Sequence, residues 1–255
     1  MNNSKLRRTL LPVGVALASL FVWHALCATG VLSPTIFPSP AQVWDAAIKE
    51  IGNGRLLNDA IASLYRVMAG FLLAAPVGVA LGLWLGLNQT VRTALLPGIN
   101  FMRSLSPLAW IPFAIVWFGV GDSPTIFLIF MAAVFPIAIS VIAACSTIPS
   151  VYYKVAKDYG LRSVERLVKI TIPAIGPQLI AAFRITALLC WLVVVAAEMI
   201  AGRDGLGFAI WDSRNGLRMD LLVLNMIAIG LIGIAADRII AQLTKLPNVR
   251  WGYER

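Results

Sequence analysis

The chain has 255 residues, of which 59% are hydrophobic and only 13% are charged. A soluble domain carries about 25% charged residues, so this composition excludes an ordinary soluble protein and indicates an integral membrane protein. The formal net charge of +9 comes from basic residues that are spread along the chain, without an aromatic–basic pattern for stacking bases. We therefore expect contact with anionic membrane lipid and no binding of nucleic acid.

Six apolar segments are close to the roughly 20 residues that a helix needs to cross a bilayer. The predicted spans cover residues 10–28, 62–87, 97–119, 124–147, 177–201 and 221–243. We interpret the first as an uncleaved membrane helix rather than a signal peptide. Six spans place both termini on one side, and the segments on that side hold most of the Lys and Arg residues. The positive-inside rule then predicts that both termini are cytoplasmic.

Two of these spans have unusual sequences. In the second, Gly78, Gly82 and Gly86 recur every four residues, a pattern that predicts close packing against another helix. In the third, Pro107 and Pro112 weaken the helix and free backbone carbonyls. Irregular backbone in a membrane is tolerated where it lines a cavity or is packed in protein.

The segment 149–175 between the fourth and fifth spans is too charged to lie in hydrocarbon. Its apolar residues recur at helical spacing and predict a short amphipathic helix: Tyr152, Val155, Ala156 and Tyr159. Gly160 is expected to end this helix, and Pro173 to end a second helical segment and begin the fifth span. A helix–turn–helix outside the membrane suits docking in a groove of another protein.

This segment resembles the EAA loop of permeases in binding-protein-dependent ABC importers, which reads Glu-Ala-Ala, three residues, Gly, nine residues, Ile, any residue, Leu-Pro. The matching positions here are Lys154, Val155, Ala156, Gly160, Ile170, Ile172 and Pro173. Three of them depart from the pattern, namely Lys154 for Glu, Val155 for Ala and Ile172 for Leu. Lys154 reverses a charge, so a salt bridge of the family glutamate does not transfer to this chain.

Longer stretches resemble the nitrate, sulfonate, taurine and bicarbonate group of these permeases. They are FPSP from Phe37, SPLAWIPFAIVWFGVGDSPTIFLIF from Ser106 and WLVVVAAEMIAGRDGLG from Trp191. The resemblance implies an all-α membrane protein with six transmembrane helices and a cytoplasmic coupling loop, the type I ABC importer permease fold. It also implies a homodimer in the bacterial inner membrane, two cytoplasmic ATPase subunits that hold ATP and Mg, and an extracytoplasmic solute-binding protein. The implied solute is a small oxyanion: nitrate or nitrite, bicarbonate, or a sulfonate such as taurine.

In this family resemblance, the coupling loop contacts the ATPase, so we expect that role for Tyr152, Val155, Ala156, Tyr159, Gly160 and Pro173. A permease for a vitamin precursor and a stand-alone secondary transporter are the alternatives. The sequence has no P-loop and no Ser-His-Asp set, so we expect no enzymatic activity in this chain. Its single histidine and three widely separated cysteines predict no metal or cofactor site.

Polar and aromatic residues inside the spans are the candidates for the translocation path. They are Arg103, Ser104, Ser106, Trp110, Trp191 and Glu198. Arg103 either attracts an anion or serves a structural role, for example paired with Glu198. The two tryptophans either narrow a pore or pack at an interface. For Glu198 a salt bridge or subunit contact is favoured over substrate binding, and we interpret residues 202–207 as an external turn.

Overall fold

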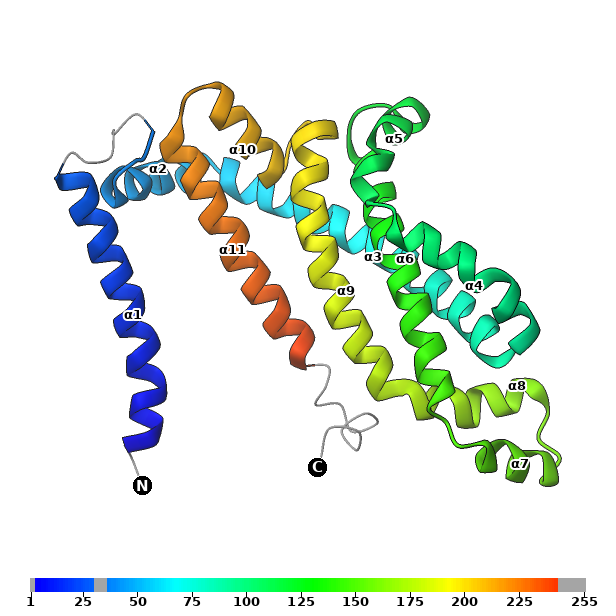
Figure 1. Ribbon diagram of the computed structural model, residues 1–255. Coiled ribbons are helices and arrows are strands. Elements are labelled where there is room, and N and C mark those ends of the chain that lie inside the picture. Colours follow the sequence, from blue (N-terminus) through cyan, green and yellow to red (C-terminus); the bar gives the residue numbers. More distant parts are fainter. Residues whose placement is uncertain (1–2, 30–35, 243–255) are drawn as a thin grey trace.

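The computed structural model describes residues 3–29 and 36–242, and all regular secondary structure in these residues is helical (Figure 1). The helices are α1 (Asn3–Ala28), α2 (Pro40–Gly52), α3 (Arg55–Leu87), α4 (Gln89–Ser104), η1 (Pro107–Trp110), α5 (Ile111–Phe118), α6 (Asp122–Ser146), α7 (Ser150–Asp158), α8 (Ser163–Arg166), η2 (Leu167–Thr171), α9 (Ile172–Ala201), α10 (Leu206–Asn215) and α11 (Met219–Gln242).

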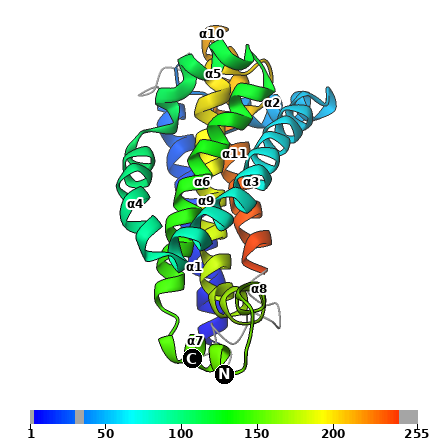
Figure 2. The same ribbon diagram turned by 90° about the vertical axis from the view of Figure 1, so that its right-hand side faces the viewer.

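Helices α3, α6 and α9 form the centre of the molecule, with α6 packed between the other two. α6 is the most buried of the long helices, because apolar residues occupy almost its whole circumference. α4 covers one side of this centre, and α11 and α10 pack beside α9 (Figures 1 and 2). α1 stands apart and contacts mainly α2 and the residues just before it, with Trp23 donating a hydrogen bond to the carbonyl of Pro38 at 3.1 Å.

The glycines of α3 allow the close approach of α3 to α6. A β-carbon on Gly78 would lie 2.8 Å from the carbonyl oxygen of Val134, and one on Gly82 would lie 2.5 Å from Cβ of Val141. Neither position has room for a larger residue, since both neighbours are backbone or branched side chain. The helix packing predicted from the glycine spacing is therefore confirmed.

Within residues 3–29 and 36–242, five helices are long and apolar enough to cross a membrane, namely α1, α3, α6, the continuous helical run 163–201, and α11. Five of the predicted spans lie on these helices, although residue 243 of the sixth is outside the described residues. The predicted third span, 97–119, is not one continuous helix. It divides into α4 and the pair η1–α5, which meet at an angle of 85° and together make the sixth candidate span.

The division of this span has a local cause. Leu105 and Ser106 adopt extended backbone, because Pro107 disfavours helical geometry in the residue before it and has no N–H to donate. α4 also begins at Gln89, so residues 89–96, which lie between the predicted second and third spans, form its first two turns.

The segments that connect the long helices lie at two opposite ends of the molecule. α7 and α8 lie at one end, together with the N-terminal end of α1 and the C-terminal end of α11 (Figure 1). α2, α5 and α10 lie at the opposite end, and α6, α9 and α11 run between the two. This arrangement separates the charged segment 149–175 from the turn at residues 202–205.

Candidate functional site

The polar residues predicted in the third span gather at the break between α4 and η1. Arg103, Ser104 and Ser106 line one pocket of about 490 Å³. α6 supplies part of the wall with Met131, Ala132 and Pro136, and α9 supplies Leu189. Three of the six candidate path residues are therefore brought together, next to a stretch of extended backbone. We call this the break pocket.

Charge and hydrogen-bond donors distinguish the break pocket from its apolar surroundings. Ser104 donates its hydroxyl hydrogen to the carbonyl of Asn100 at 2.8 Å, which leaves the oxygen lone pairs for other donors. Arg103 is exposed, and its side chain has no ion pair with a carboxylate of the described residues. An arginine is always protonated and carries five donors, so it brings a permanent positive charge to this surface.

The two tryptophans among the candidates do not line the break pocket. Trp191 is buried, donates from Nε1 to the carbonyl of Ile229 at 3.2 Å, and packs against Gly233 of α11. Trp110 ends η1 and packs with Phe113 and Trp117 of α5. Both tryptophans thus contact other parts of the same chain, and their role at a pore or an interface stays a prediction.

Glu198 also lies outside the break pocket, in a buried ionic network near the opposite end of the molecule from α7. It is 0% exposed and accepts hydrogen bonds from Nη1 of Arg66 at 2.7 Å, from Ser63 at 2.8 Å and from the backbone N–H of Gly207 at 3.0 Å. Glu198 therefore forms its ion pair with Arg66 and not with Arg103, which was one of the alternatives that we considered for Arg103.

Arg66 connects four parts of the chain through the same network. Besides Glu198 it contacts Asp122 at the start of α6, with nitrogen–oxygen distances of 2.6 and 2.7 Å, and the carboxylate and carbonyl of Asp204. Asp59 accepts from the backbone N–H of Gly205 at 3.0 Å. The turn 202–205 is thereby fastened to α3, which supports our interpretation of this stretch as structural. We call these residues the Arg66 network.

Sequence reasoning missed Arg66, because we took the part of this helix before about Met68 for a polar entry to the second span. The sequence nevertheless contains a pattern that could have identified this residue. Asp59, Ser63 and Arg66 follow one another at spacings of four and three, which places all three on one face of a helix. A polar face on a helix that is otherwise apolar points to a buried partner of opposite charge.

The coupling segment forms two short helices around a glycine turn. α7 ends at Asp158, and Gly160 has a φ of +69°, the left-handed geometry predicted for the residue that ends this helix. Tyr152 and Tyr159 are 59% and 82% exposed, and Val155 is exposed as well. Ala156 differs, since it is 2% exposed and packs inward. The outward face therefore consists of Tyr152, Val155 and Tyr159.

The second half of the coupling segment is continuous with a membrane span. α8, a turn of π-helix in η2, and α9 follow each other without a break, and Pro173 lies in the first turn of α9. Our expectation that Pro173 ends the second helical segment is therefore wrong, because the helical run continues through this residue. The turn of π-helix directly before Pro173 already shifts the regular hydrogen-bond ladder, so the missing N–H of proline is accommodated there. Tyr153 of α7 lies 3.2 Å from the hydroxyl of Thr171 in η2, which ties both halves of the segment together.

A family model for the inner membrane component of binding-protein-dependent transport systems matches residues 76–246, which include the break pocket residues and the coupling segment. The chain belongs to this family. It is therefore a permease component of an ABC importer, and a non-catalytic one.

Named relatives cover most of this permease. The nitrate import permease protein NrtB of Synechocystis sp. is 35% identical over 242 residues, covering 91% of this chain and 87% of the relative. The bicarbonate transport system permease protein CmpB of Synechococcus elongatus is 33% identical over 253 residues, covering 94% and 90%. MJ0413 of Methanocaldococcus jannaschii is 35% identical over 237 residues, covering 91% and 88%.

Among solved structures, the permease resembles a chain of the MetNI methionine ABC transporter in its inward-facing conformations. The TM-score is 0.55 at 22% identity, over 74% of this chain and 96% of that chain. This similarity shows the fold, and it agrees with the predicted all-helical type I importer permease.

Proposed function

We propose that this permease carries a small oxyanion into the cell, as the membrane subunit of an ABC importer in the bacterial inner membrane. The observation that carries the proposal is the break pocket, which places the cation of Arg103 beside the hydroxyls of Ser104 and Ser106. The relatives named for nitrate and bicarbonate transport support the solute class. Nitrate, nitrite, bicarbonate and sulfonates share the negatively charged oxygens that these donors suit.

The break pocket suits passage rather than tight retention of an anion. Arg103 and the hydroxyl of Ser106 are few donors, since Ser104 already donates to the carbonyl of Asn100, and the pocket is partly open to its surroundings. A transport site must bind well enough to admit the ion and weakly enough to release it. The extended backbone at Leu105 and Ser106 also stands where two helical segments meet at 85°, so a change of this angle would reshape the pocket.

The partners follow from the coupling segment. In our proposal two copies of the chain form a shared path, and one cytoplasmic ATPase docks on the face Tyr152, Val155 and Tyr159 of each copy. A separate extracytoplasmic protein delivers the solute. α7 and the continuous run from α8 to α9 then transmit the closure of the ATPases to the spans. ATP binding biases the equilibrium between two arrangements of the spans.

We also propose that both termini face the cytoplasm. The N-terminal end of α1 and the C-terminal end of α11 lie at the same end of the molecule as α7 and α8 (Figure 1). The segment 150–171 at that end carries more basic than acidic residues, which the positive-inside rule places inside.

The test is uptake by proteoliposomes that contain the permease with its co-purified ATPase, supplied with its binding protein and with labelled nitrate, bicarbonate or taurine. Arg103→Gln should reduce uptake about tenfold or more, because it removes a charged donor from the pocket. Arg92→Gln, near the other end of α4, is the matched control and should leave uptake close to native. Equal uptake by both variants would remove Arg103 from the path, and no ATP-dependent uptake of any oxyanion would refute the solute class.

A further inference from the structure

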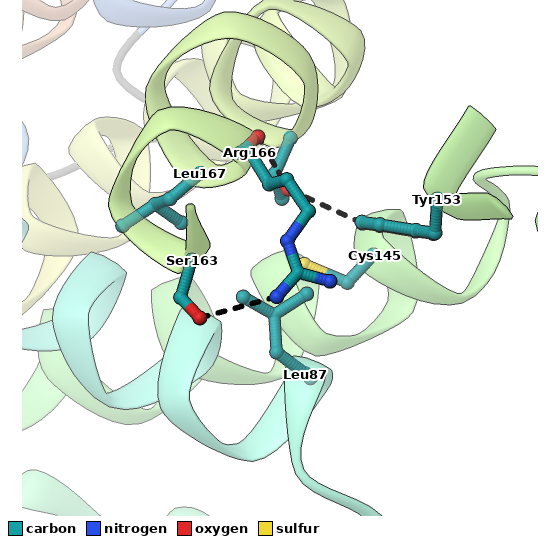
Figure 3. A pocket seen from close by; sticks show the side chains of 8 residues that line it. Leu87, Cys145, Tyr153, Ser163, Arg166 and Leu167 are labelled. Atoms are coloured by element: carbon teal, nitrogen blue, oxygen red, sulfur yellow. Dashed lines mark hydrogen bonds between the residues drawn. The ribbon is translucent and has the colours of Figure 1, made fainter. Parts of the chain in front are cut away.

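A second pocket lies beneath the coupling segment, at the opposite end of α6 from the Arg66 network. Its volume is about 410 Å³, and it is lined by the end of α3, the end of α6, α7, α8 and η2. Leu87 and Cys145 form an apolar wall, and Tyr153, Ser163, Arg166 and Thr171 supply the polar groups (Figure 3). The break pocket shares none of these residues, so this pocket is a separate site.

Arg166 is the unusual member of this pocket. Its Nη2 donates to the hydroxyl of Ser163 at 3.1 Å, whereas its Nε is buried and has no hydrogen-bond partner among the described residues. The guanidinium also makes no ion pair with a carboxylate in the described part of the chain. Figure 3 shows it between Leu87, Ser163 and Tyr153. Arg166 as a whole is only half-buried, but its buried Nε without a hydrogen-bond partner is costly, and an anion in the pocket would offset that cost.

The remaining groups around Arg166 favour a negative ligand. Tyr153 and Thr171 share one hydrogen bond at 3.2 Å, and the Thr171 hydroxyl donates to the carbonyl of Arg166 only at 3.5 Å. Because this second bond is long, a ligand oxygen in the pocket can accept the Thr171 hydroxyl hydrogen in its place. Glu165, the acidic neighbour, is already engaged by the backbone N–H of Arg162 at 2.9 Å and by Lys169 at 3.5 Å. The surrounding segment is net basic, which strengthens the attraction of an anion to this end of the molecule.

We propose that this pocket binds a phosphate-like oxyanion through Arg166, Ser163 and the Tyr153–Thr171 pair. The planar fork of arginine matches two oxygens of such a group, and the hydroxyls match a third. The source is either a free cytoplasmic anion or the phosphate of a lipid headgroup. The assignment to the cytoplasmic side rests on the orientation in the proposed function. A bound anion bridges α8 and η2 to α7 beside the ends of α3 and α6, and so holds the coupling segment in place.

The first experiment uses the full-length chain, delipidated in detergent, and follows thermal unfolding through tryptophan fluorescence. Sodium phosphate is titrated against sodium chloride at equal ionic strength. We expect phosphate to raise the midpoint by several degrees for the native chain and for Lys157→Gln, an exposed cation of α7 that does not line the pocket. Arg166→Gln should weaken phosphate binding about 10- to 100-fold. Ser163→Ala, which keeps the charge, should weaken it about threefold or more.

A second experiment separates the two sources. Phosphatidylglycerol is added to the delipidated chain in micelles without free phosphate. Stabilisation by phosphate assigns the site to a free anion, and stabilisation by the lipid alone assigns it to a headgroup, provided that Arg166→Gln abolishes either effect. The proposal is overturned if neither addition stabilises the native chain, or if Arg166→Gln responds like Lys157→Gln. Since neither experiment uses the ATPase or measures uptake, this result does not depend on whether the proposed solute is correct.

Discussion

At the scale of single residues, the cost of burying charge explains the Arg66 network. Arg66 and Glu198 are both almost completely buried, whereas the side chains of Asp122 and Asp204 are more than half exposed. If Arg66 is removed, water can hydrogen-bond to the carboxylates of the two exposed aspartates, but it cannot reach the buried carboxylate of Glu198. Loss of the arginine would therefore leave one carboxylate uncompensated in the interior.

We expect Arg66→Leu to lower the free energy of unfolding by about 3–5 kcal/mol, the usual cost of breaking a buried pair by removing one partner. Glu198→Gln should cost less, because the amide keeps a hydrogen bond to Ser63 or Gly207 and Arg66 keeps both aspartates. The control is Arg55→Leu on the same helix, whose pair with Asp212 is half exposed and worth at most about 1 kcal/mol. Thermal unfolding in detergent ranks the three variants, and equal losses for Arg66→Leu and Arg55→Leu would contradict this account.

At the scale of helices, the close approach of α3 and α6 depends on glycine. Gly82→Ala places a methyl group 2.5 Å from Cβ of Val141, so one helix must shift. Overpacking of this kind costs about 1–3 kcal/mol. Gly98→Ala on α4 is the control, because a β-carbon there meets no atom within 4 Å. We expect a lower unfolding midpoint for Gly82→Ala and an unchanged or higher one for Gly98→Ala, since alanine favours helix. A midpoint of Gly82→Ala at or above that of the native chain would show that the packing is looser than described.

The outward face of α7 yields a prediction about coupling. Tyr152→Glu combined with Tyr159→Glu places two charges on exposed positions, so the fold of the permease should be unaffected. In the proposed assembly the double variant should lose most ATP-driven uptake and retain less ATPase on purification. Lys154→Gln, also on α7 and exposed, is the control. Ala156 is unsuitable for this test, because its side chain is buried and a charge there would disturb the loop itself. Native uptake by the double variant would exclude this face from docking.

The helices and their contacts also show how much of the structure the sequence alone can predict. The presence of the long helices, the close packing at the glycines of α3 and the turn at Gly160 all follow from local sequence patterns. The structure contains all three features. The partner of Glu198 and the inward direction of Ala156 depend on which helices meet, which no local pattern contains. The break before Pro107 lies between these cases. Its cause is local, but the 85° angle is set by packing against α6 and α9.

At the scale of the whole molecule, the two ends differ in what they hold. One end carries the coupling segment with its basic residues and the pocket at Arg166, and the other carries α2, α5, α10 and the turn held by the Arg66 network. Transport in one direction requires such an asymmetry, because the ATPase and the delivering protein must engage different surfaces. The proposed orientation assigns the first end to the cytoplasm.

Cysteine labelling tests this orientation directly. Lys157→Cys on α7 and Arg214→Cys on α10 place thiols on exposed positions of helices that lie at opposite ends of the molecule. The native thiols Cys145 and Cys190 are buried and should react slowly with a charged reagent, whereas Cys27 is partly exposed and is replaced by serine in both variants. In intact spheroplasts a charged maleimide should label Arg214→Cys but not Lys157→Cys. Permeabilised membranes should label both, which shows that the second thiol is accessible once the reagent can enter. Labelling of Lys157→Cys in intact spheroplasts would show that the orientation is the reverse of the one proposed. The coupling segment would then be out of reach of any cytoplasmic ATPase.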